Sequence, residues 1–247
     1  MTSSASDGAA AAAPARDILT IPQRSAGMVM HPARTLAAAI RDRRWGALLL
    51  VMTLTAVGAG TGVMSTATGQ QALVDGWERT AAALGVPLDD SAYGRLRASR
   101  HWAPAYAAAA ALIAIPMAAA GAAVALRATV GRSTGIPFAA VMAMTVHAGV
   151  VLMLRQLAGA VLTYATESTV SRLTLGAWFP GVDPASAIAR LLGFVDLFVV
   201  WWIGLLAVGT ALLYGLSARR VMGAFLALYL AVAVVAAALL AVLGGRA

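Results

Sequence analysis

The stretch Phe194-Val-Asp-Leu-Phe-Val-Val-Trp-Trp202, FVDLFVVWW, opens an apolar run that continues to Tyr214. A run of this length fits a helix that crosses the roughly 30 Å hydrocarbon core of a bilayer. The run contains one carboxylate, Asp196, whose charge needs a partner or a proton in an apolar solvent. The stretch therefore predicts a membrane helix that carries one polar site.

The whole chain has the composition of a membrane protein. Of its 247 residues, 61% are hydrophobic and 11% are charged, which leaves too little polar surface to cover a water-soluble fold. All 18 basic residues are arginine, and lysine, asparagine and cysteine are absent, a usage that we attribute to GC-rich codons in a bacterium. Without cysteine the chain has no disulfide and no thiolate metal site. The net charge of +8 comes from arginines that mostly flank apolar segments, so we expect a membrane surface and no nucleic acid as the partner.

Five apolar segments are long enough to cross a bilayer, at roughly 20 residues each. They cover residues 45–64, 104–126, 136–157, 190–214 and 221–243. We therefore predict an all-α, polytopic membrane bundle of five transmembrane helices over residues 28–247, with a long outer loop at 65–103. Residues 1–27 are small, polar and interrupted by proline, and we expect them to form a flexible cytoplasmic tail.

Arginines are concentrated on one side of the predicted bundle. They precede the first span and follow the second and the fourth: Arg34, Arg41, Arg43, Arg44, Arg127, Arg132, Arg219 and Arg220. The positive-inside rule then places the N-terminus in the cytoplasm and the C-terminus outside, in a bacterial inner membrane. The segment 31–44 has Leu36 and Ile40 four residues apart, so we expect a short amphipathic helix that lies on the membrane surface.

Two short helices are expected in the outer loop. Apolar residues recur at helical spacing from Leu73 to Leu84, and Gly85 supplies a stop signal. Asp89 stands where it could cap the second helix. We expect the loop to pack as a small cap on the bundle.

Three ionisable residues fall inside predicted spans: His147, Arg155 and Asp196. Arg155 lies late in the third span and Asp196 early in the fourth, so both side chains are expected near the outer leaflet at similar depths. An ion pair that docks the two helices is the interpretation we favour. The alternatives are a proton or ion pathway through Asp196 and an Arg155 that only extends to the interface. His147 could line the same internal face, but a hydrogen-bonded packing histidine explains it better.

Other residues suggest packing and no catalysis. Gly58 and Gly62 form a Gly-x-x-x-Gly pair in the first span, where another helix could approach closely. Trp201 and Trp202 lie deeper than an interfacial belt, so at least one is expected to pack between helices. The sequence has no phosphate-loop lysine, no nucleophile elbow and no second histidine at metal-binding spacing. We therefore expect no enzyme, no metal and no cofactor.

The order of these elements resembles the Yip (Ypt-interacting protein) family of small polytopic membrane proteins. Residues 31–50 (HPARTLAAAIRDRRWGALLL), 131–144 (GRSTGIPFAAVMAM) and 191–225 (LLGFVDLFVVWWIGLLAVGTALLYGLSARRVMGAF) carry the resemblance. Within the last segment the positions similar to the family's pattern are Asp196, Phe198, Trp201 or Trp202, Leu205, Leu206, Gly209, Ser217 and Arg219. The chain departs from the family in its long outer loop and its short, low-complexity tail.

The resemblance implies a five-span architecture and a membrane-organising or partner-binding role. Eukaryotic relatives are linked to Rab-type GTPases, which a bacterium is not expected to offer. We therefore predict a non-enzymatic inner-membrane protein that contacts the lipid bilayer and other membrane proteins or a second copy of itself. The alternatives are a transporter or channel component that uses His147, Arg155 and Asp196, and an accessory subunit of a membrane complex.

Overall fold

The computed structural model describes residues 20–83, 85–86, 89–130, 135–167, 172–179, 181–182 and 186–244. These residues form helices, joined by short connections and one isolated β-bridge between Thr174 and Asp196. Five helical segments, one of them made of two consecutive helices, are long and apolar enough to cross a membrane. The prediction of an all-helical, five-span membrane protein is confirmed at this level. Most of the expected tail, residues 1–19, lies outside the described residues.

The helices of the five spans lie close to the predicted segments. Their bounds are Gly46–Met64 for α3, Ala103–Val130 for α6, Phe138–Ala148 and Val150–Thr166 for α7 and α8, Leu197–Tyr214 for α10 and Ala218–Gly244 for α11. The third span is longer than predicted, because α8 continues past residue 157. Gly149 alone separates α7 from α8.

The fourth span is shorter than the predicted 190–214. Its first residues belong to a separate helix, α9 (Ala187–Phe194), and the backbone is extended at Val195 and Asp196. The break has a local cause, because the Asp196 carboxylate accepts hydrogen bonds from the backbone N–H groups of Phe198 and Val199 and so starts a new helix.

The remaining helices lie at the two ends of the bundle. Their bounds are Ile21–Met30 for α1, Pro32–Asp42 for α2, Ala67–Ala83 for α4, Asp90–Ser99 for α5, Arg100–Trp102 for η1 and Leu175–Trp178 for η2. Two short helices in the outer loop were predicted, and α4 and α5 confirm them. Asp89 caps α5 by accepting a hydrogen bond from Ala92 N, and Gly85 takes a left-handed φ of 70° after α4.

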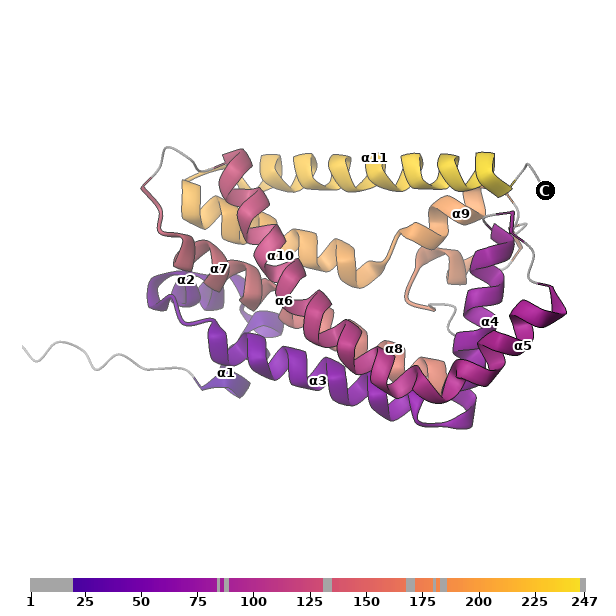
Figure 1. Cartoon of the computed structure of the whole chain (residues 1–247). Coiled ribbons are helices and arrows are strands. Elements are labelled where there is room, and N and C mark those ends of the chain that lie inside the picture. Colours follow the sequence, from indigo (N-terminus) through magenta and orange to yellow (C-terminus); the bar gives the residue numbers. More distant parts are fainter. Residues whose placement is uncertain are drawn as a thin grey trace, which may run out of the picture.

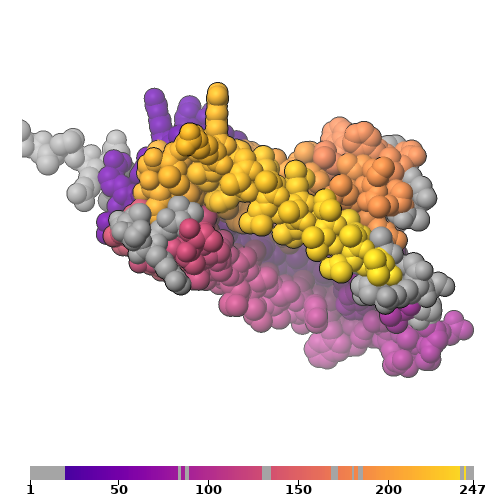
Figure 2. Space-filling model, turned by 90° about the horizontal axis from the view of Figure 1, so that it is seen from above, coloured from indigo at the N-terminus to yellow at the C-terminus, as the bar shows by residue number. Residues whose placement is uncertain are grey.

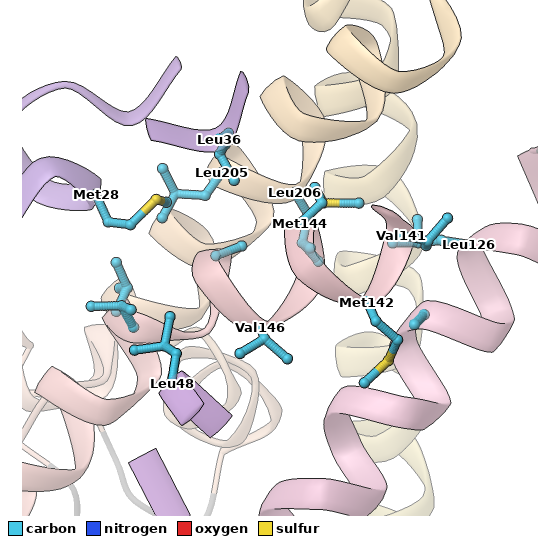
Figure 3. Packing of buried hydrophobic residues seen from close by; sticks show 14 of the residues in the cluster. Met28, Leu36, Leu48, Leu126, Val141, Met142, Met144, Val146, Leu205 and Leu206 are labelled. Atoms are coloured by element: carbon cyan, nitrogen blue, oxygen red, sulfur yellow. The ribbon is translucent and has the colours of Figure 1, made fainter. Parts of the chain in front are cut away.

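The helices α1 and α2 pack on each other and on the bundle, and we call residues 20–42 the N-terminal hairpin. Met28 and Leu36 are fully buried in the main hydrophobic cluster, where Figure 3 shows them in one group with Leu205 and Met144. The tail prediction is wrong for residues 20–27, because α1 begins there and Gln23 accepts a hydrogen bond from Thr20 N.

The expected surface helix is also corrected. Its apolar face, with Leu36 and Ala39, packs against α7 and α10 and not on lipid. An amphipathic pattern predicts an apolar face that will be covered, but it does not say whether protein or lipid covers it.

Successive spans alternate in direction, so the bundle has two ends (Figure 1). The N-terminal hairpin, the start of α7 and the connection from α10 to α11 share one end, which we call the hairpin end. The helices α4, α5 and α9 lie at the opposite end, the cap end. The centre is α7, whose residues Ala140–Ala148 are all buried. Figure 2 shows α11 lying across one face, in view along its length.

Candidate functional site

Arg155 and Asp196, the pair favoured from the sequence, lie in contact. Arg155 Nε donates to Asp196 Oδ2 at 2.7 Å. The pair joins the middle of α8 to the first turn of α10. The Asp196 side chain is 5% exposed and that of Arg155 is 36% exposed, so the carboxylate is enclosed while the guanidinium also reaches a pocket.

Hydrogen bonds of the Asp196 side chain and of its backbone N–H explain its place. Its Oδ1 atom accepts from Phe198 N at 2.9 Å and from Val199 N at 3.3 Å. Its own backbone N–H donates to the Tyr229 hydroxyl at 3.1 Å, and that hydroxyl donates to Phe194 O at 2.6 Å. The residue therefore stands at the N-terminus of α10, not inside the fourth span, and it links α8, α9, α10 and α11.

His147 belongs to a different polar cluster. It is fully buried at the end of α7, where Nδ1 lies 2.7 Å from Ala143 O and Nε2 lies 3.3 Å from Arg24 Nη1. A carbonyl oxygen only accepts and a guanidinium only donates. The imidazole is therefore neutral, with its proton on Nδ1, and Nε2 accepts from Arg24.

Arg24 joins the N-terminal hairpin to the bundle. Its Nη1 contacts His147 on α7, and its Nη2 donates to Asp42 Oδ2 at 2.9 Å. Arg24 is 6% exposed, and a buried guanidinium is tolerated when both a carboxylate and a neutral acceptor meet it. The alternative in which His147 shares one face with Arg155 and Asp196 does not match these contacts, because His147 pairs with the hairpin and Arg155 pairs with Asp196.

Arg24 and Tyr229 were not among the predicted site residues. A signal for α1 was present, because Thr20 and Gln23 form a capping box around Pro22. No local signal marks Tyr229, whose role arises only when α11 packs beside the break between α9 and α10.

The predicted packing residues behave differently from one another. A Cβ added at Gly58 or Gly62 would meet nothing within 4 Å, so none of the described helices uses the pair for a close approach. Trp202 packs against the main hydrophobic cluster. Trp201 is 37% exposed.

Three pockets follow one another along α3, each reaching α7 or α8. The first has a volume of about 550 Å³, is lined by Trp45 and by residues 46–48 of α3, and includes Arg24 and His147. The second, of about 90 Å³, is apolar and reaches Gln156. The third, of about 210 Å³, shares Gln156 and is lined by Arg155 and Arg172. Polar groups thus stand at both ends of the row, with an apolar pocket between them.

The described residues include no group of three or more histidine, aspartate or glutamate side chains placed to hold a metal ion. No family model, curated protein or solved structure matches this chain. The resemblance to the Yip family therefore rests on the quoted residues alone.

Proposed function

We propose that this chain is a non-enzymatic, Yip-type membrane protein whose N-terminal hairpin is a partner-binding platform at the cytoplasmic face of a bacterial inner membrane. The proposal includes the membrane-organising role that such a platform gives when the partner is another membrane protein. It rests on the way the hairpin is attached and on what its outer face carries.

The observation that carries the proposal is the attachment by Arg24. A loosely held amphipathic helix needs only lipid, whereas this hairpin has a buried cation between Asp42 of α2 and His147 of α7. Removing one partner from a buried, hydrogen-bonded charge is strongly destabilising. The hairpin is therefore held in one fixed orientation, which is what a binding platform requires.

The outer face of the hairpin is cationic. Arg34, Ala37 and Arg41 follow one another on this face of α2, and all three are exposed. Arg219 and Arg220, at the same end of the bundle, are also exposed. The arginines that precede α3, lie in the last turn of α6 and follow α10 gather at this end, so the positive-inside rule supports a cytoplasmic hairpin end.

Photo-crosslinking in native membranes tests the proposal. A photoreactive residue at Ala37 reports on the outer face of the hairpin, and one at Ala98, exposed on α5, is the control at the cap end. We expect discrete protein adducts from position 37 that are missing from position 98. Arg24→Met, which frees the hairpin, should weaken these adducts, whereas Arg34→Met should leave the hairpin docked and retain a substantial part of them.

Two results would refute this function. If position 37 gave no protein adducts, the hairpin would not be a partner-binding platform. Equal adducts from both positions would show that crosslinking reports crowding only.

Transport is a second candidate, and the row of pockets along α3 favours it. Gln156 lines two of the three pockets, and Arg155 and His147 stand in the outer two. Proton or potassium flux in proteoliposomes that is lost in Gln156→Leu and kept in Gln71→Leu, a change in α4, would favour transport over the platform. If the flux through the wild-type protein were no higher than that of empty liposomes, transport would be ruled out.

A further inference from the structure

The pocket of about 550 Å³ at the hairpin end combines three arginines with apolar residues in its lining. Arg24, Arg43 and Arg44 line it, together with Trp45. No carboxylate is among its described lining residues. Arg24 is neutralised by Asp42, but neither Arg43 nor Arg44 forms an ion pair with any described residue. The pocket therefore has an uncompensated positive charge.

Two helix N-termini add to this charge. Thr20 and Ile21 at the start of α1, and Gly46 and Ala47 at the start of α3, line the same pocket. The first turn of α3 has no side-chain cap, so its N–H groups remain available to an acceptor. Helix N-termini carry a partial positive charge and bind anions, phosphates above all, when other cations stand beside them.

The backbone conformation at Arg43 is one that suits glycine better than arginine. Arg43 ends α2 with a left-handed φ of 55° and ψ of 19°. Glycine is the usual residue at such a position, because it has no Cβ that would be strained there. Arg43 therefore has a strained backbone, and its guanidinium lines the pocket.

The position of the pocket decides between a lipid and a soluble ligand. Trp45 and Gly46 stand where α3 enters the membrane, at the level of lipid headgroups and interfacial tryptophans. From the pocket, Ala47, Val51 and Leu54 follow one face of α3 at helical spacing, and all three are exposed. An apolar strip that begins at a cationic pocket fits an acyl chain attached to a phosphate.

We propose that this pocket binds the phosphate headgroup of an anionic phospholipid, with an acyl chain along the exposed face of α3. Arg43 and Arg44 hold the phosphate beside the N-terminus of α3, and Trp45 packs at the glycerol level. The inference rests on the membrane placement of α3 and needs no protein partner, so the crosslinking result leaves it untouched.

Native mass spectrometry of the full chain in detergent tests the site. Short-chain phosphatidylglycerol is titrated against short-chain phosphatidylcholine, and inorganic phosphate is added in a separate arm. We expect a bound phosphatidylglycerol that phosphatidylcholine does not replace and that inorganic phosphate does not displace at equal concentration. The double variant Arg43→Gln, Arg44→Gln should bind phosphatidylglycerol roughly 30-fold more weakly, because it loses the usual attraction of two basic residues for an anionic lipid. The matched control, Arg34→Gln with Arg41→Gln, changes exposed arginines outside the pocket and should keep most of the affinity.

Arg43→Gly separates binding from folding. Glycine relieves the left-handed backbone, so the thermal unfolding temperature should stay equal or rise while the affinity for phosphatidylglycerol falls. Equal binding of the two lipids, unchanged binding in the double variant, or displacement by inorganic phosphate at equal concentration would each overturn the lipid site.

Discussion

Arg155 Nε and Asp196 Oδ2, 2.7 Å apart, join α8 to the first turn of α10. The same carboxylate caps α10 through Phe198 N and Val199 N. One side chain thus neutralises a cation of the third span and begins the fourth span. The charge of Asp196 is tolerated in this apolar run because it stands at a helix N-terminus with an arginine beside it.

A double-mutant cycle should show this coupling. Asp196→Ala removes both the cap and the ion pair and should lower the free energy of unfolding by about 3 kcal/mol. Arg155→Ala should cost about 1 to 2 kcal/mol, since its guanidinium is partly exposed. When unfolding is measured in detergent, the double mutant should lose less unfolding free energy than the two single mutants lose in sum. Asp196→Asn, which keeps a capping oxygen, should fall between wild type and Asp196→Ala. Strictly additive losses would mean that the pair is not coupled.

Tyr229 should hold α11 to the break between α9 and α10. Tyr229→Phe removes the hydroxyl that accepts from Asp196 N and donates to Phe194 O. We expect a loss of about 1 kcal/mol in the free energy of unfolding, together with faster hydrogen exchange in α11. Tyr106→Phe is the control, because Tyr106 is an exposed tyrosine of α6. Equal effects of the two changes would leave the Tyr229 hydroxyl without a structural role.

The cap of α5 should fail in acid. The backbone hydrogen bond from Ala92 and the side-chain hydrogen bond from Ser91 lower the pKa of Asp89 below its ordinary value of 3.8. Because the pKa of Asp89 is lower in the folded chain, its ionised carboxylate stabilises α5 when the pH is above 3.8. This contribution is lost as the pH falls through the lower pKa of the folded chain.

Hydrogen exchange measures this effect. Amides in the first turn of α5 should lose protection progressively as the pH falls below 3.8, compared with neutral pH, after correction for intrinsic exchange. Asp89→Asn should keep a capped helix whose protection no longer depends on the charge of this side chain. Protection that is unchanged across this range in the wild type would contradict the assignment.

Gly209 should resist enlargement. A Cβ at this position would overlap Met144 Cγ on the central helix α7, so Gly209→Ala should lower the free energy of unfolding by about 1 to 3 kcal/mol. Gly223→Ala in α11 is the matched control, because a Cβ there meets nothing within 4 Å. That change should leave stability equal or slightly higher. Equal thermal unfolding temperatures for the two variants would mean that α7 and α10 are not packed at Gly209.

The spans were predictable from the sequence because their signal is local. Length and hydropathy locate α3, α6 and α11 closely, and Asp89 marks the start of α5. The break before Asp196 was missed because an apolar run hides a helix start when the capping residue is the only polar one in it. The placement of α1 was missed because the partner of Arg24 on α7 is distant in sequence, and no local pattern connects the two.

The central claim is that the N-terminal hairpin is docked on the bundle, and cysteine accessibility tests it most directly. The natural chain has no cysteine, so Ala37→Cys and Ala39→Cys each give one label site, the first exposed and the second 1% exposed. With a water-soluble maleimide in native membranes, position 37 should react rapidly and position 39 should be protected until Arg24→Met releases the hairpin. Equally rapid labelling of both positions in the chain that keeps Arg24 would contradict docking and would show a hairpin free of the bundle.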